Sequence, residues 1–171
     1  MDFLELMQKR RSVRSFKEKE IPQELLDKIL EAVRIAPSAG NIQSYKIKII
    51  KDREVKEHLV KASFGQKFIA QAPIVIAFLA HPEEAKKHYG DRGEQLYSIQ
   101  DATIALYTAH LATEELGLGS CWIGAFDNEY VLSAINADKK KYICVGFLPI
   151  GYPDDKARAK KRKELKELIL E

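Results

Sequence analysis

Cysteine is scarce in this chain of 171 residues, and long apolar runs and low-complexity tracts are absent. The two cysteines, Cys121 and Cys144, have no neighbouring histidines at ligand spacing, so the sequence predicts neither a disulfide framework nor a metal site. No apolar stretch approaches the roughly 20 residues that a membrane helix needs. The N-terminus lacks the basic-then-apolar order of a signal peptide. We therefore expect one domain over residues 1–171, in the cytoplasm and without a membrane partner.

The chain also has only a small excess of positive charge. The formal net charge is +3, and it comes from two clusters rather than from the whole chain. One cluster is the C-terminal segment from residue 156 onward, and the other contains Lys9, Arg10, Arg11 and Arg14. Because the rest of the chain is close to neutral, a broad nucleic-acid-binding face is not indicated. Two local clusters suit a compact anion better, and a solvated basic tail is the alternative interpretation.

The spacing of apolar residues predicts a mixture of helices and strands. Helical spacing runs from residue 3 to the first basic cluster and then covers residues 22–37, 52–61, 95–116 and 131–135. Strand patterns cover residues 45–49, 72–80, 121–123 and 142–150. Gly117 and Gly119 are expected to end the long helix. This mixture is typical of an α+β or α/β sandwich.

The densest functional motif is RRSVRSF at residues 10–16. Arginine stays charged and binds phosphate through paired hydrogen bonds, and the serine hydroxyls can add further contacts. The alternative interpretation is structural, because cations at a helix C-terminus are favoured by the helix dipole.

Two loops have the composition of a site for a planar ligand. In APSAGNIQ at residues 36–43, small residues accompany Asn41 and Gln43, which each offer a donor and an acceptor to a pyrimidine-like edge. In GLGSCWIG at residues 117–124, Gly124 leaves room and an exposed N–H for a ring. The alternatives are an ordinary helix-ending loop and a tight helix-to-strand connection.

Side-chain machinery for catalysis is missing from the sequence. It contains no G-x-S-x-G elbow, no G-x-G-x-x-G fingerprint and no Walker-type lysine loop. Asp101 is expected to make a buried polar contact of structural importance. The histidines are scattered and are expected at surface or interface positions: His58, His81, His88 and His110. We therefore assign no catalytic side chain and no metal ligand, and expect the chemistry to belong to a bound organic cofactor.

Taken together, these segments resemble the flavin-dependent nitroreductase family over nearly the whole chain. The resemblance is carried by RRSVRSF, APSAGNIQSYKIKII, GLGSCWIGAF, and LPIGYP followed by a basic tail. It implies an α+β fold, namely a nitroreductase-like three-layer α/β sandwich with a central, mainly antiparallel sheet and a C-terminal arm at about residues 153–171. It also implies an intertwined homodimer with FMN in the interface, contacted by both subunits.

The resemblance assigns the basic motif to the two ends of FMN. Arg10, Arg11 and Ser12 would hold the phosphate and ribityl end. Arg14 would reach the pyrimidine side near N1 and O2, where a cation stabilises reduced flavin.

Further FMN contacts come from several segments. Pro37, Ser38 and Ala39 of the partner subunit would touch the isoalloxazine ring, supported by Asn41. The remaining contacts that the resemblance implies are Gln66 on the flavin, Ile123 and Gly124 along the ring near N5, and a K-x-R pair of Lys160 and Arg162 on the phosphate. Lys161 and Lys163 offer a shifted register for that pair.

The implied activity is an FMN-dependent oxidoreductase that passes electrons from NADH or NADPH to nitroaromatics, quinones or similar acceptors by a ping-pong mechanism. Other flavin reactions on the same fold, such as flavin fragmentation, dehalogenation or azoline oxidation, are alternatives, as is a non-enzymatic binding module with a basic tail. Ser44 and Tyr45 stand where the family often has Pro-Trp, and the segment at residues 81–95 is short. Both departures predict a reshaped and more open substrate side.

Overall fold

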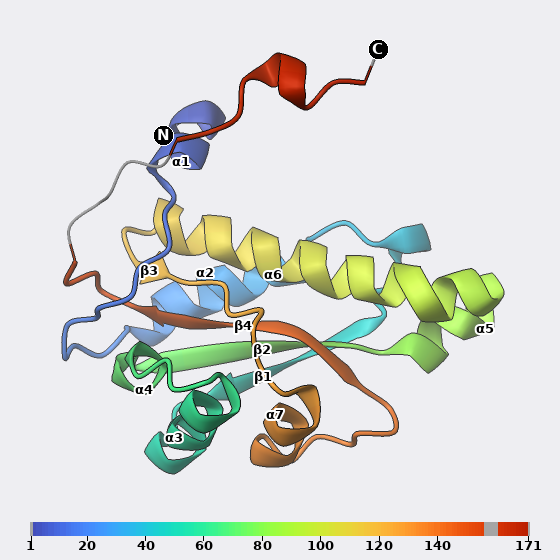
Figure 1. The fold of residues 1–171 in the computed structure, drawn as a ribbon, viewed down its shortest axis with the longest axis horizontal. Coiled ribbons are helices and arrows are strands. Elements are labelled where there is room, and N and C mark those ends of the chain that lie inside the picture. The colour runs from blue at the N-terminus through green and yellow to red at the C-terminus, as the bar shows by residue number, and fades with distance from the viewer. Residues whose placement is uncertain (1, 156–160, 171) are drawn as a thin grey trace.

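A four-stranded antiparallel sheet lies between two layers of helices (Figure 1). The computed structural model describes residues 2–155 and 161–170. In chain order its elements are α1 (Phe3–Lys9), α2 (Gln23–Arg34), the 3-10 turn η1 (Ala39–Asn41), β1 (Tyr45–Ile50), α3 (Arg53–Ala62), α4 (Phe68–Gln71), β2 (Ile74–Ala80), α5 (Pro82–Arg92), the π-helical turn η2 (Gly93–Tyr97), α6 (Ser98–Glu115), β3 (Gly119–Ser120), α7 (Asn128–Ala134), β4 (Ile143–Gly151) and η3 (Leu165–Glu167).

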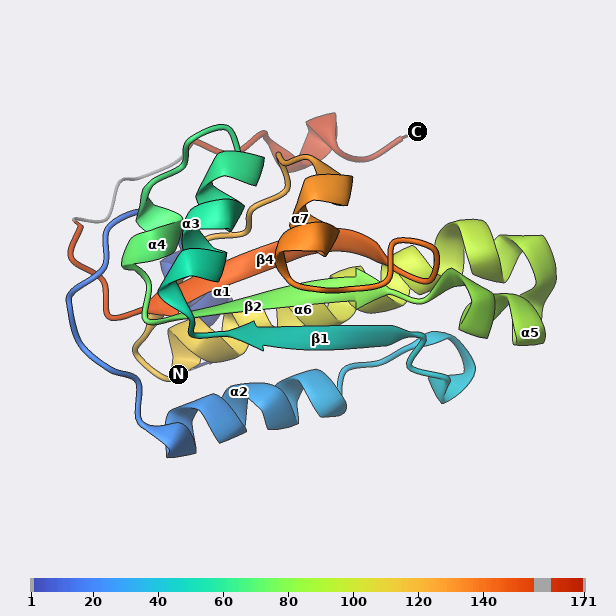
Figure 2. The ribbon, with the colours of Figure 1, turned by 90° about the horizontal axis from the view of Figure 1, so that it is seen from below.

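The strand order is β1-β2-β4-β3, and every pairing is antiparallel. Every residue of β2 is buried, because helices cover both faces of the sheet. Ile76 and Phe78 pack with α2 and α6, whereas Val75 and Ala77 pack with α3 and α7 (Figure 2). This explains why the strand is a continuous apolar run instead of an alternating one. The predicted three-layer α+β sandwich is confirmed.

Local signals in the sequence set several of the helix ends. The Asp52 carboxylate accepts a hydrogen bond from the Val55 N–H at 2.9 Å and caps α3. Gly117, with φ of +75°, follows α6 and turns the chain toward β3. The end of the long helix is therefore confirmed, while its start lies at Ser98, after the π-helical turn.

One predicted strand and two missed helices need correction. Residues 121–123 do not form a strand, since β3 contains only Gly119 and Ser120. The next partner on β4 is Pro149, which has no N–H to donate, and the ladder stops there apart from an isolated bridge between Ile123 and Phe147. Residues 68–71 and 82–92, for which we predicted no element, form α4 and α5.

The segments before α2 and after β4 run side by side. Phe16 and Pro153 form an isolated antiparallel bridge, and the Asp154 N–H donates to the Ser15 carbonyl at 2.9 Å. The chain beyond β4 therefore starts next to the RRSVRSF motif. Residues 161–170 are all exposed and contain η3. Within the described part of the chain, none of the helices combines the length and apolar character needed to cross a membrane.

Candidate functional site

The basic motif lies along the edge of the sheet, beside β3 (Figure 1). Ser12 forms a parallel bridge with Ser120, and the Val13 N–H donates to the Ser120 carbonyl at 3.0 Å. Val13 is 1% exposed and fixes this segment to the core. Arg10 and Ser12 are half-buried and Arg14 is exposed, so the motif presents its cations at the protein surface around one buried anchor.

Arg11 is already paired with a carboxylate of the C-terminal side. Its guanidinium donates to Asp155 Oδ1 at 2.5 Å and to the Asp155 carbonyl at 2.8 Å. The Arg14 backbone N–H donates to the second carboxylate oxygen at 3.0 Å. Burial by itself would raise the pKa of Asp155, but these bonds from Arg14 and Arg11 lower its pKa below the ordinary value. Arg11 thus links the basic motif to the residue that directly precedes the C-terminal basic segment.

Replacing Asp155 with asparagine is expected to lower the free energy of unfolding by about 1 kcal/mol at neutral pH, because the ion pair is partly exposed and screened. The folded-state pKa lies below the unfolded value, so the stabilisation is present above the unfolded pKa and is lost as the pH falls through the folded pKa. Urea denaturation of both proteins at neutral and acidic pH measures the difference. An unchanged difference in acid would contradict this assignment.

Arg10 contacts a histidine that we expected at the surface. His110 is 3% exposed, which makes that prediction wrong for this residue. Arg10 Nη1 lies 3.0 Å from His110 Nε2, while Arg10 Nε is buried and has no hydrogen-bond partner among the described residues. Buried donors are nearly always satisfied. This unsatisfied donor is the feature of the motif that best fits an anionic ligand.

The loop after β3 comes close to the same region. Ile123 is buried and exchanges two backbone hydrogen bonds with Phe147, at 2.9 and 3.2 Å. Gly124 follows it, is exposed, and has no atom closer than 3.6 Å to the position of an added Cβ. Further along, the Asp127 N–H donates to the Ala62 carbonyl, which brings this loop to the turn that carries Gln66. The basic motif, the loop at residues 117–124 and the turn with Gln66 therefore lie on one side of the subunit.

The loop with Pro37, Ser38 and Ala39 lies elsewhere and is held by Asp101. This carboxylate is 2% exposed, accepts from the Ala39 N–H at 2.9 Å and accepts from the Ser44 hydroxyl at 2.7 Å. The buried polar contact predicted for Asp101 is confirmed.

The same loop stores backbone strain. Gly40, Asn41 and Gln43 all have φ between +54° and +58°, a left-handed conformation that costs roughly 1 kcal/mol for a residue with a side chain. Strained backbone of this kind persists only where its surroundings hold it, and it is frequent in ligand-binding loops.

Helix α6 separates this loop from the basic motif. Asp101 lies near the start of α6 and His110 nine residues later, which corresponds to about 14 Å along the axis. Figure 1 shows η1 near the α5 end of α6, and β3 at the opposite end. Within one subunit the two predicted groups of contacts do not meet. The prediction that residues 37–39 act on the partner subunit's ligand is compatible with this separation.

Only one member of the predicted K-x-R pair, Arg162, lies among the described residues. Lys160 lies outside the described residues, and Arg162 is exposed in the segment that precedes η3. The K-x-R register stays a prediction.

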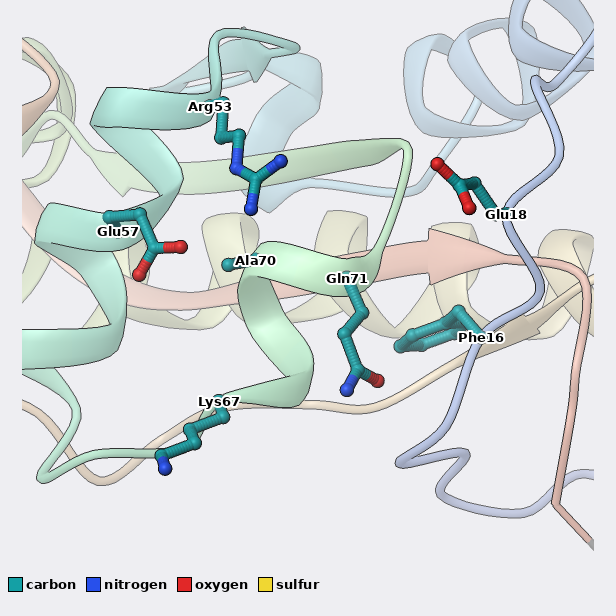
Figure 3. A pocket seen from close by; sticks show the side chains of 7 residues that line it. All are labelled: Phe16, Glu18, Arg53, Glu57, Lys67, Ala70 and Gln71. Atoms are coloured by element: carbon teal, nitrogen blue, oxygen red, sulfur yellow. The ribbon is translucent and has the colours of Figure 1, made fainter.

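A pocket of about 370 Å³ lies next to the basic motif (Figure 3). None of the residues predicted to contact FMN lines it. Its lining comes from α3, from α4 and the residue before it, and from the end of the basic motif and the residues that follow: Phe16, Glu18, Arg53, Glu57, Lys67, Ala70 and Gln71. Two cations and two carboxylates leave it without net formal charge. An anionic ligand is therefore favoured at the basic motif and not in this pocket.

Comparison with known proteins accounts for the combination of fold and motifs. The profile of the Nitroreductase family matches residues 7–67 and 60–152. The chain belongs to the Nitroreductase family. The matched residues include the basic motif, both loops and the whole sheet.

Individual Nitroreductase-family relatives cover most of the chain. An FMN reductase [NAD(P)H] of Bacillus subtilis is 35% identical over 164 residues, covering 89% of this chain, which spans 66% of that relative's length. An NADH dehydrogenase of Thermus thermophilus is 31% identical over 189 residues, covering 95% of this chain and 92% of the relative.

Solved structures of Nitroreductase-family proteins superpose on nearly the whole chain. An FMN-dependent nitroreductase from Clostridium difficile has a TM-score of 0.82 and 28% identity, covering 99% of this chain and 98% of its own. NfrA2 of Bacillus megaterium has a TM-score of 0.88 and 27% identity, covering 98% of this chain and 72% of its own.

Proposed function

We propose that this protein is an FMN-dependent oxidoreductase that passes electrons from NADH or NADPH to nitroaromatic, quinone or similar electron-poor acceptors by a ping-pong mechanism. The observation that carries the proposal lies at the edge of the sheet beside β3, where the buried Nε of Arg10 lacks a partner among the described residues. FMN, when bound, supplies the hydride acceptance and electron donation that the side chains do not provide.

The residues on this edge fit such a cofactor. Arg10 supplies a buried, unsatisfied donor and a positive charge for a phosphate. Arg14 has no hydrogen bond or ion pair on its guanidinium within residues 2–155 and 161–170, and it is placed to stabilise negative charge. Gly124 is exposed, and an added Cβ there would meet only the Trp122 indole, at 3.6 Å, so a flat ring can approach the backbone from the other side. Arg11 contributes less than the motif implies, because Asp155 already neutralises it.

We extend the proposal to a homodimer with two shared sites. Residues 37–39 and the basic motif lie at opposite ends of α6, so a complete site takes one group from each subunit. Apolar side chains are also left on the surface of α1, of α6 and of the segment around η3: Phe3, Leu4, Ile104, Leu165, Leu168, Ile169 and Leu170. Exposed apolar groups of this size support association with a second copy.

The purified protein is expected to be yellow and to bind FMN. Replacing Arg10 and Arg14 together with alanine should weaken FMN binding at least about 100-fold, because each charged hydrogen bond contributes on the order of 1.5–3 kcal/mol. Fluorescence titration of FMN measures the affinity, and the melting temperature with and without FMN provides a second readout.

A matched control removes the same charge elsewhere. Lys46 and Lys48 are exposed on β1, away from the basic motif, and alanine at both positions should leave FMN affinity unchanged. The proposal would be refuted if the wild-type protein were colourless after incubation with saturating FMN and removal of the free flavin, and if its melting temperature were the same with and without FMN. Equal loss in both double variants would refute the specific role of Arg10 and Arg14.

A further inference from the structure

His110 connects the basic motif to β3 from the far half of α6. Its side chain is buried, with Arg10 Nη1 at 3.0 Å from Nε2 and Ser120 Oγ at 2.6 Å from Nδ1. Ser120 also receives the Val13 N–H on its carbonyl. The histidine therefore touches the same two segments whose pairing shapes the site, although the sequence motifs gave it no role.

The chemistry of its partners fixes the form of the imidazole. A guanidinium is only a donor, so His110 Nε2 must be the acceptor and the ring proton must lie on Nδ1, where it donates to Ser120 Oγ. Burial, assisted by the positive charge of Arg10, lowers the pKa of His110 to about 4. The ring is therefore neutral at neutral pH.

The other charged groups near this contact come from α6, from the end of α1 and from the basic motif. The Glu114 carboxyl lies one turn after His110 and close to Lys9, Arg10 and Arg11. Burial raises the pKa of Glu114, while those cations act in the opposite direction. Within the described residues, no hydrogen bond joins Glu114 to the Arg10 guanidinium. His110 is therefore the group that orients the Arg10 guanidinium.

A neutral acceptor and a carboxylate have different consequences for an arginine. Asp155 holds Arg11 by an ion pair and cancels its charge. His110 holds Arg10 by one hydrogen bond and leaves the full positive charge in place. The Nε of Arg10 remains buried without a partner among the described residues, so orientation is achieved without using all the donors. This combination suits a cation that must stay fixed and still bind an anion.

We propose that His110 is a positioning residue, which holds the Arg10 guanidinium through Nε2 so that its remaining donors bind the phosphate of FMN. The inference rests on the proposed function and names the group on which phosphate recognition depends. It differs from the role of a satisfied core histidine, because a core histidine would affect stability without distinguishing FMN from riboflavin, which lacks the phosphate.

Two substitutions distinguish the roles of the two ring nitrogens of His110. In His110→Asn the amide lies near the position of Nδ1, so the Ser120 contact is kept and the Arg10 contact is lost. In His110→Gln the amide reaches the position of Nε2, so an oxygen can still accept from Arg10. The control is Thr113→Val on the same buried side of α6, since the Thr113 hydroxyl donates to the Ala109 carbonyl and not to Arg10.

The measurement is the ratio of the dissociation constants for riboflavin and FMN at neutral pH. We expect the asparagine variant to lose about tenfold in FMN affinity, which corresponds to one charged hydrogen bond, with riboflavin affinity unchanged. The glutamine and Thr113 variants should keep the wild-type ratio. An unchanged ratio in the asparagine variant, or equal loss for both flavins, would overturn the assignment of His110.

The outcomes also separate this inference from the proposed function. A wild-type protein that binds neither flavin defeats both. A wild-type protein that binds FMN and riboflavin equally keeps the flavin function and overturns the role of His110. Should the asparagine variant not fold, the ¹⁵N resonance of His110 Nε2 in the wild-type protein decides: we expect it to shift with FMN and not with riboflavin, and equal shifts would contradict the inference.

Discussion

Replacing Asp101 with leucine is expected to lower the free energy of unfolding by about 2–5 kcal/mol and to abolish FMN binding. The substitution removes the acceptor of the Ala39 N–H and of the Ser44 hydroxyl, and each group left unpaired in the interior costs roughly 1–3 kcal/mol. It also releases a loop with two non-glycine residues in the left-handed region, Asn41 and Gln43. Urea denaturation and FMN titration measure the two effects.

Asparagine at the same position provides the control. Its amide oxygen can accept from the Ala39 N–H and its amino group can donate to Ser44 Oγ, so both contacts are satisfied without a carboxylate. We expect Asp101→Asn to keep most of the stability and the FMN affinity. If the leucine variant were as stable as the asparagine variant, Asp101 would not be the anchor of the loop.

Mixed dimers can show whether that loop acts on its own subunit or on the partner. One subunit would carry alanine at Arg10 and Arg14, and the other would carry leucine at Asp101. In shared sites, one site of the mixed dimer receives both defects and the other receives none, so about half of the FMN capacity returns. In sites built from one chain, both sites stay defective. Differently tagged subunits allow the mixed dimer to be purified and its flavin content measured.

The sequence predicts the fold well where its signal is local. The apolar run of β2, the cap at Asp52 and the stop at Gly117 each depend on side chains close in the chain, and the structure contains all three features. The Nitroreductase family could also be predicted, because four short motifs occur in the right order. The predicted strand at residues 121–123 failed because its limit is set by Pro149, which lies on another strand.

Parts of the site depend on contacts between distant residues and give no local signal. His110 lies among small and apolar residues on α6, and nothing in that pattern indicates a partner 100 positions earlier in the chain. The same holds for Asp155, whose neutralisation of Arg11 changes what the basic motif can offer. One indirect signal existed for both: each is a polar residue in or beside an apolar segment, where an unpaired group would be costly.

Alanine at Gly119 is expected to lower the free energy of unfolding by about 1–3 kcal/mol and to weaken FMN binding, because overpacking here displaces the basic motif. An added Cβ would lie 2.6 Å from Val13 Cγ2 and 2.8 Å from Pro153 Cγ. Val13 Cβ is also only 3.0 Å away, so a change of rotamer cannot relieve the contact and the backbone must move. Since Val13 anchors Arg10 and Arg14, the movement reaches the proposed phosphate site.

Gly117, two residues before Gly119, provides a control for the conformational cost of replacing a glycine. Its φ is +75° and no atom lies within 4 Å of an added Cβ, so Gly117→Ala should cost roughly 1 kcal/mol and leave FMN affinity unchanged. Adding Val13→Ala to Gly119→Ala removes the closest contact, that with Val13 Cγ2, while the contacts with Pro153 Cγ and Val13 Cβ stay, so part of the FMN affinity should return, a non-additive result in a double-mutant cycle. Additive losses would mean that the packing of Val13 on Gly119 does not position the basic motif.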